Sequence, residues 1–204
     1  GNPHPDAILT PQINGASQPS IRPRSTYVHR RTNIGRSACF FAAYLITHIN
    51  FEQGVFMKDE LRSAMKQKRR ALTKEETEIC GAKISDRLFC LPEIKNADTV
   101  MTYVSAFNEV PTDGIINTLF SMKKRVAVPV SNTDTETITV TYITKSDGFS
   151  KGAYGIREPK TIHKASLSDI DVILVPALAF DLKLNRMGFG KGYYDKLLSG
   201  FFGV

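Results

Sequence analysis

The 204-residue sequence lacks the features that mark several specialised classes of protein. No apolar stretch reaches the roughly 20 residues that a membrane-spanning helix needs. The longest apolar run, residues 38–46, lies far from the first residue and has no clear small-residue cleavage site after it, so we do not expect a secretory signal. The three cysteines are an odd number without Cys-x-x-Cys spacing, which predicts free buried thiols in a reducing cytosol.

Composition and charge are those of a soluble globular protein. Hydrophobic residues make up 42% of the chain and charged residues 23%, and the length allows one domain of ordinary size with or without an appendage. The net charge of +7 suits anionic ligands. It would also suit nucleic acid, although the sequence has no nucleic-acid-binding motif. A basic nucleic-acid-binding protein with a disordered arm is therefore one alternative, and a solvated basic surface is another.

Composition divides the chain near residue 56. Residues 1–35 are rich in Pro, Ser, Thr, Asn and Arg without periodicity, which is typical of disorder, and residues 36–56 show neither a helix cap nor clean alternation. We expect residues 1–56 to be a disordered or non-native extension. One hypothesis is a translated leader, because residues 53–55 can be encoded by a ribosome-binding sequence placed just before an initiator Met57; the alternative is a genuine disordered extension.

From Met57 onward the patterns are those of regular secondary structure. An apolar stripe and a basic ridge on another face predict a first helix; the stripe is Leu61, Ala64, Met65 and Leu72, and the ridge is Lys58, Arg62, Lys66 and Arg69. Thr73 and Glu76 form a capping box for a helix from Lys74 to about Cys90.

Strands and helices alternate through the rest of the chain. Strands are expected at residues 99–105, 125–130, 137–143 and 171–175, a helix capped by Thr112 is expected at residues 112–123, and a last helix follows the glycine-rich segment. No repeat occurs at a fixed period. The order predicts one α/β domain with a three-layer, open, largely parallel sheet flanked by helices.

The chain is organised around the octet Gly188-Phe189-Gly190-Lys191-Gly192-Tyr193-Tyr194-Asp195. It lies between a buried-strand pattern and a helical pattern, where free N–H groups at a helix start attract anions and glycines let the backbone approach a phosphate. Asn185 and Gly192 do not fit a Walker P-loop, and Tyr193 does not fit the dinucleotide fingerprint. The octet alone is compatible with a phosphate site or with a tight turn bearing a solvated lysine.

Residues 185–195 resemble the nucleotide-binding signature of the 5-formyltetrahydrofolate cyclo-ligases, also called methenyltetrahydrofolate synthetases, and further similar segments follow the family's order within residues 57–195. The resemblance implies ATP-dependent cyclisation of 5-formyltetrahydrofolate to 5,10-methenyltetrahydrofolate, with release of ADP and phosphate. It implies ATP and Mg²⁺ as cofactors. We expect a cytoplasmic monomer that binds these small molecules and neither nucleic acid nor membranes.

The resemblance also implies roles for individual residues. Lys191 and Arg186 are the expected catalytic cations around the transferring phosphoryl group. Asp195 is the expected Mg²⁺ ligand, with an ion pair to Lys191 as the alternative. Val104, Glu109 and Tyr193 are the expected folate contacts, and residues 154–159 are similar to a segment near the folate. The expected nucleotide contacts are Lys58, Arg62, Arg186, Met187, Gly188, Phe189, Gly190, Lys191, Gly192, Tyr193 and Tyr194.

The sequence departs from the family pattern in two places. Phe189 stands at a position that is often basic in relatives. Typical members continue beyond the Tyr-Tyr-Asp segment with another strand and a further metal-binding carboxylate, so we expect residues 57–204 to be a cyclo-ligase-like domain truncated at its C-terminus, with an exposed sheet edge. Two interpretations follow, an active cyclo-ligase and a truncated relative that binds nucleotide or folate without catalysis.

Overall fold

The structure is a computed structural model that describes residues 26–31, 37–42, 55–181 and 185–202. A seven-stranded sheet has the order β1-β2-β9-β3-β4-β5-β8. The central strands β2, β9, β3 and β4 are mutually parallel, while β1, β5 and β8 pair antiparallel at the edges. The strands are β1 (Thr26–Arg31), β2 (Ser37–Ala42), β3 (Thr99–Met101), β4 (Arg125–Asn132), β5 (Thr137–Ile143), β8 (His163–Lys164) and β9 (Val172–Pro176).

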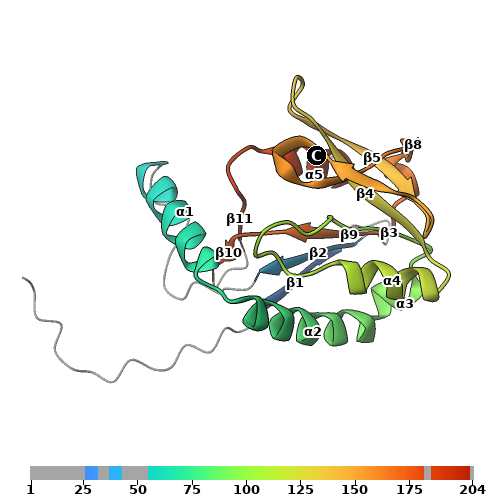
Figure 1. Cartoon of the computed structure of the whole chain (residues 1–204), viewed down its shortest axis with the longest axis horizontal. Helices are drawn as coiled ribbons and strands as arrows, with labels where there is room; N and C mark the ends of the chain where they lie inside the picture. Colours follow the sequence, from blue (N-terminus) through green and yellow to red (C-terminus); the bar gives the residue numbers. More distant parts are fainter. Residues whose placement is uncertain (1–25, 32–36, 43–54, 182–184, 203–204) are drawn as a thin grey trace, which may run out of the picture.

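Helices cover both faces of this sheet (Figure 1). The helices are α1 (Val55–Arg70), α2 (Lys74–Cys90), α3 (Pro92–Asn96), α4 (Asp113–Ser121) and α5 (Tyr193–Phe202). In Figure 1, α2, α3 and α4 lie on one face, α5 lies on the other, and α1 stands at one end. The predicted three-layer α/β architecture is confirmed, with the parallel strands at its centre.

Two apolar clusters, one on each face of the sheet, form because side chains alternate along a strand. In β9, Val172 and Leu174 pack with α2, α3 and α4, whereas Ile173 and Val175 pack with α5. This strand is therefore buried on both faces, as expected for the middle of a parallel sheet. Its uninterrupted apolar run is what made it visible in the sequence.

The capping box predicted for α2 is present. The Thr73 hydroxyl accepts from the Glu76 N–H at 3.1 Å, and the Glu76 carboxylate accepts from the Thr73 N–H at 2.9 Å. The prediction for Thr112 was wrong in its chemistry. Thr112 precedes α4 but makes no side-chain cap; its hydroxyl accepts instead from the Ser105 N–H at 2.9 Å, and it thereby closes the loop after β3. The strand expected at residues 99–105 is shorter than predicted and ends at Met101.

Strands β1 and β2 lie within residues 1–56, the predicted extension. β2 pairs in parallel with β9 and so takes part in the sheet. The sequence did not predict these strands because residues 1–35 show no periodicity and residues 36–56 show no clean alternation of apolar and polar residues. Residues 1–25, 32–36 and 43–54 lie outside the described residues, and the interpretation of residues 1–56 as a disordered or non-native extension stays a prediction.

A short antiparallel ribbon separates β9 from the glycine-rich octet, and the sequence did not predict it. It consists of β10 (Ala179–Phe180) and β11 (Arg186–Met187). The buried Asp181 carboxylate accepts from the Asn185 N–H and side-chain amide, both at 2.8 Å. Leu61 and Met65 of α1 pack against this ribbon, which brings α1 beside the octet. A second ribbon pairs β6 (Phe149–Lys151) with β7 (Arg157–Pro159).

Candidate active site

The segment 188–192, which we call the glycine loop, connects β11 to the N-terminus of α5. Gly190 has φ +106° and Gly192 has φ +74°, values that residues with a side chain rarely adopt. The Asp195 and Lys196 N–H groups both donate to the Gly192 carbonyl, which starts the helix. The N–H groups before them have no intrahelical partner and lie at the positive end of the helix dipole, as an anion site requires.

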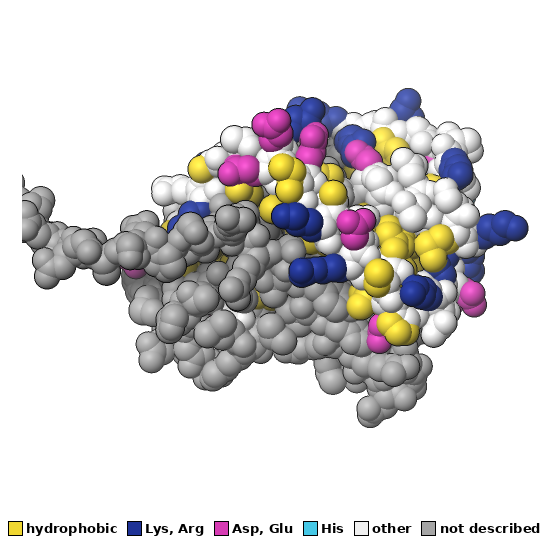
Figure 2. Space-filling view, turned by 90° about the horizontal axis from the view of Figure 1, so that it is seen from below, with side chains coloured by type: hydrophobic (Ala, Val, Ile, Leu, Met, Phe, Trp, Pro, Cys, Tyr) yellow, Lys and Arg dark blue, Asp and Glu magenta, His cyan; other side chains and the backbone are white. Residues whose placement is uncertain are grey.

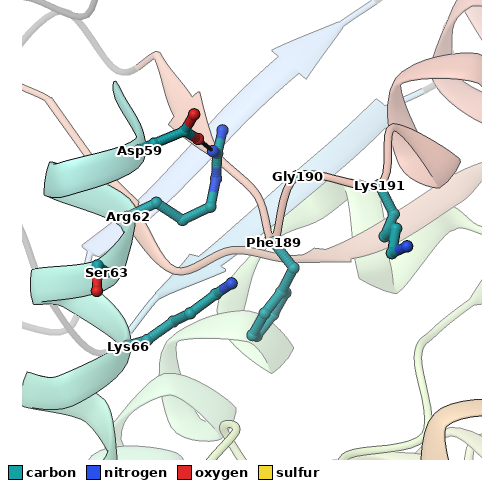
Figure 3. A pocket seen from close by; sticks show the side chains of 7 residues that line it. All are labelled: Asp59, Arg62, Ser63, Lys66, Phe189, Gly190 and Lys191. Atoms are coloured by element: carbon teal, nitrogen blue, oxygen red, sulfur yellow. Dashed lines mark hydrogen bonds and ion pairs between the residues drawn. The ribbon is translucent and has the colours of Figure 1, made fainter. Parts of the chain in front are cut away.

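Helix α1 forms the opposite wall of this site. The Arg62 Nε donates to the Gly188 carbonyl at 3.2 Å, and Arg62 also pairs with Asp59. A pocket of about 400 Å³ lies between the helix and the loop; it is lined by Asp59, Arg62, Ser63, Lys66, Phe189, Gly190 and Lys191. Figure 3 shows Lys66 reaching from α1 toward Phe189, with Lys191 on the far side of the loop. Three cations from two elements therefore border one pocket.

Gly190→Ala is expected to raise the KM for ATP, the nucleotide that the sequence resemblance implies, roughly tenfold, equivalent to about 1.4 kcal/mol. The φ of +106° strains any L residue, and an added Cβ would lie 3.3 Å from the Arg62 Nε. Gly114→Ala is the matched control, because no atom lies within 4 Å of a Cβ there and its φ is not positive. Steady-state kinetics with both variants measure the effect, and an unchanged KM in Gly190→Ala would contradict it.

Arg186 and Asp195 form an ion pair in the structure. The Arg186 side chain is 12% exposed and its Nη1 donates to the Pro176 carbonyl at 3.3 Å, whereas the Asp195 side chain is 71% exposed. The partner of Asp195 is thus Arg186 and not Lys191. The exposure of the Asp195 side chain leaves the carboxylate accessible to a cation from solvent. Among the described residues no group of three or more His, Cys, Asp or Glu could hold a metal ion. A single carboxylate still fits Mg²⁺, which is often held by one carboxylate, phosphate oxygens and water.

The loop after β3 lies at the carboxyl edge of the parallel strands and carries Glu109. Its Oε2 accepts from the Ala106 N–H at 3.0 Å, and its Oε1 lies 3.2 Å from the Arg69 Nη2. Burial raises the pKa of Glu109, and the charge of Arg69 opposes this effect. Both side chains are about one-tenth exposed. The Glu109 carboxylate is therefore held in one position and is largely shielded from solvent.

The structure does not bring every predicted residue to the pocket. Lys58 is exposed on α1, one turn before Arg62, and does not line the pocket. Val104 is 3% exposed and packs in the apolar cluster that α2, α3 and α4 form, so ligand contact at Val104 stays a prediction.

The side chain of Tyr193, the first residue of α5, contacts the side chain of Tyr154. Their hydroxyls are 3.0 Å apart and their rings meet edge to face. This hydrogen bond is the main cause that raises the pKa of Tyr193 to about 12, so the phenol is neutral at physiological pH. Tyr154 is half exposed and has φ +56°. The segment 154–159, which the resemblance placed near the folate, is thus beside Tyr193.

Arg69 was not predicted to be a site residue, because the sequence pattern places the basic ridge of α1 on one face. Arg69 is 8% exposed and is the most buried member of that ridge. A signal was available, because Arg69 follows Met65 by four residues and precedes Leu72 by three, which are both buried. A cation on an apolar face needs a buried partner. Here the partner is Glu109, which a sequence pattern cannot reveal.

Fold and site together define a class of protein. A glycine loop and a helix N-terminus beside several cations, at the carboxyl edge of an open α/β sheet, are typical of enzymes that bind nucleotide phosphates. The adjacent buried carboxylate offers a polar contact for a second ligand. The chain belongs to the 5-formyltetrahydrofolate cyclo-ligase family, whose model matches residues 56–203, and it is accordingly an enzyme of the ligase class.

Curated relatives and solved structures agree with this assignment. The chain is 31% identical to a probable 5-formyltetrahydrofolate cyclo-ligase of Caenorhabditis elegans, with 70% of this chain and 73% of the relative aligned. It is also 31% identical to the Escherichia coli K12 cyclo-ligase, over 67% of this chain and 77% of the relative. The Aquifex aeolicus 5,10-methenyltetrahydrofolate synthetase matches with a TM-score of 0.62 and 34% identity, covering 70% of this chain and 72% of that one. The resemblance seen in the sequence is confirmed.

Proposed function

We propose that this protein catalyses the ATP-dependent cyclisation of 5-formyltetrahydrofolate to 5,10-methenyltetrahydrofolate, with release of ADP and phosphate. Family membership supports the proposal. The observation that carries it is the arrangement of the two predicted subsites. The cation-lined glycine loop and the loop of Glu109 meet at one edge of the sheet, and Arg69 contacts both.

The chemistry asks the protein mainly for positioning and positive charge. The formyl oxygen is a poor leaving group until it accepts the γ-phosphoryl group of ATP, whereupon ADP departs. The folate N10 then attacks the formyl carbon and loses its proton, and the carbon–oxygen bond breaks to release phosphate. Lys191, Arg186 and Arg62, with the first N–H groups of α5, stabilise the charge on the transferring phosphoryl group. Lys58 adds a more distant positive charge at the start of α1.

The nucleotide lies along the glycine loop in this proposal, against residues 186–194. Asp195 is the proposed ligand of Mg²⁺, which when bound neutralises charge on the phosphates. Arg186, paired with Asp195, fixes the direction of that carboxylate. Glu109, Val104 and Tyr193 are the proposed folate contacts. We further propose that the protein is a monomer. A cytoplasmic location is proposed from cysteine usage: Cys80 and Cys90 are both free thiols, Cys80 is buried as predicted, and the prediction of burial is wrong for Cys90, which is exposed.

No membrane or nucleic-acid partner is part of the proposal. Across the described residues, no helix combines the length and the apolar character that crossing a bilayer requires. Figure 2 shows the face that α2, α3 and α4 cover, where Lys and Arg side chains are interspersed with Asp and Glu. A basic stripe, which nucleic-acid binding favours, is not seen on the described part of that face.

The test is a spectrophotometric assay of the full chain with 5-formyltetrahydrofolate, ATP and Mg²⁺, in which the absorbance of the methenyl product is followed. A rise that requires ATP is expected. No rise, combined with thermal stabilisation by either ligand, would instead support the alternative of a relative that binds without catalysis. Salt-sensitive binding to DNA or RNA, without response to ATP or folate, would support the nucleic-acid alternative.

A further inference from the structure

We propose that Arg69 is the positioning residue that links the two substrate subsites, by holding the Glu109 carboxylate on one side and supporting Phe189 of the glycine loop on the other. This inference rests on the proposed function, in which Glu109 contacts the folate and the glycine loop contacts ATP. It goes further because it assigns a role to a residue outside the predicted site and because it predicts that binding of one substrate depends on the other.

Arg69 is locked to the Glu109 loop by reciprocal hydrogen bonds. Its Nε donates to the Asn108 carbonyl at 2.9 Å, and its Nη2 lies 3.2 Å from the Glu109 carboxylate. In return, the Asn108 side-chain amide donates to the carbonyls of Arg69 and Leu72, both at 3.0 Å. The end of α1 and the loop after β3 therefore form one hydrogen-bonded unit. A planar guanidinium suits this role because its donors are fixed in a fork.

On its other side, Arg69 contacts the glycine loop. Its guanidinium carbon lies 5.1 Å from the centre of the Phe189 ring, within the range of a cation–π interaction. Phe189 itself is 44% exposed and lines the pocket with Lys66. Two turns earlier on α1, Arg62 binds the Gly188 carbonyl. Helix α1 thus contacts the glycine loop at two points, and its C-terminal end contacts the loop after β3.

Glu109 depends on Arg69 for its charge as well as its position. The titratable and charged groups that face it are Arg69 of α1, Tyr103 before the loop and Tyr194 of α5. Burial raises the pKa of Glu109, and Arg69 is the positive charge that opposes this. Without Arg69 the carboxyl would remain protonated to higher pH. If folate binding needs the ionised carboxylate, folate affinity falls on acidification, and this fall begins at a higher pH without Arg69 than in the wild type.

The phenylalanine gives the coupling a route. A glycine loop that moves around a bound nucleotide would shift the ring, and the ring lies against the guanidinium that fixes Glu109. Phosphate binding at the loop is thereby expected to alter folate affinity, and by thermodynamic reciprocity folate is expected to alter nucleotide affinity to the same extent.

The experiment measures binding of 5-formyltetrahydrofolate by calorimetry, with and without a non-hydrolysable ATP analogue, alongside steady-state kinetics from pH 5 to 8. Arg69→Met is expected to weaken folate binding at least tenfold and to shift its pH profile upward, while the KM for ATP changes less than threefold. Arg69→Lys retains a charge without the fork and is expected to be intermediate. Phe189→Leu is expected to remove most of the dependence of folate affinity on nucleotide. Arg70→Met, whose side chain is exposed on the same turn, is the matched control.

The outcomes separate this inference from the proposed function. Wild-type protein that does not bind folate would overturn both. Folate binding by wild-type protein that is unchanged in Arg69→Met and Arg69→Lys, at every pH, would overturn the inference alone. Circular dichroism establishes that each variant is folded. If Arg69→Met does not fold, the pH profile of Arg69→Lys decides, because a purely structural role would leave that profile in place.

Discussion

Replacing Lys191 with alanine is expected to lower kcat about 10²- to 10³-fold, equivalent to about 2.7–4 kcal/mol of transition-state stabilisation. Lys191 borders the pocket between the glycine loop and α1, where the phosphoryl group would transfer. Charge that develops on the phosphoryl oxygens must be met by fixed cations and backbone dipoles. Because the lysine is exposed, its loss should leave the free energy of unfolding within about 0.5 kcal/mol of the wild type.

The measurement is initial-rate kinetics of methenyl product formation under saturating ATP and folate. Lys74→Ala is the matched control, because Lys74 lies on α2 and does not line the pocket. Its Nζ lies 3.7 Å from the Glu78 carboxylate, and both side chains are exposed, so this ion pair is weak. The kcat of Lys74→Ala should equal that of the wild type. A Lys191→Ala enzyme with unchanged kcat would show that the glycine loop does not contact the transferring group.

The second large effect concerns stability. Arg69→Met is expected to lower the free energy of unfolding at neutral pH by about 3 kcal/mol or more, because removal of one partner leaves the other charge buried and unpaired. Both side chains are about one-tenth exposed, so water screens the pair little. Urea denaturation followed by circular dichroism measures the change; the sequence has no tryptophan, and the helices provide the signal.

The pH dependence of this effect has a definite sign. The pKa of Glu109 is raised in the folded state by burial, so its contribution to stability is present below the unfolded pKa and is lost as pH rises through the folded pKa. Removing Arg69 raises the folded pKa further and deepens that loss. The variant should therefore approach the wild type near pH 4 and fall progressively below it toward pH 7, by at most about 1.4 kcal/mol per pH unit.

The double variant Arg69→Met/Glu109→Gln provides the control for this interpretation. It removes both charges, and more than half of the lost stability at neutral pH should return. A double variant that is as unstable as Arg69→Met, with the same pH dependence, would mean that the cost lies in lost packing and hydrogen bonds to Asn108 and not in the unpaired carboxylate.

Much of the fold could be predicted because it is encoded over short stretches. The capping box of Thr73 and Glu76 fixes the start of α2, and the predicted bounds of α2 and β5 match the structure. The apolar run of β9 reports burial on both faces. The missed elements carry weaker local signals. Ribbon β10–β11 has two residues per strand, and β2 joins the parallel strands by pairing with β9, in a register that places Ser37 beside Val172, 172 − 37 = 135 residues away in the sequence.

For the site, the sequence by itself determined the glycine loop, since residues with a side chain rarely adopt the backbone angles of Gly190 and Gly192, and the helix start follows directly. Only the tertiary structure decided which charges face one another. Asp195 pairs with Arg186 and not with Lys191, and Arg69 leaves the solvated ridge to join Glu109 and Phe189. The physical reason is that burial of a charge depends on what the rest of the chain packs over it, and residues 69, 109 and 189 meet only when α1, the loop after β3 and the glycine loop converge.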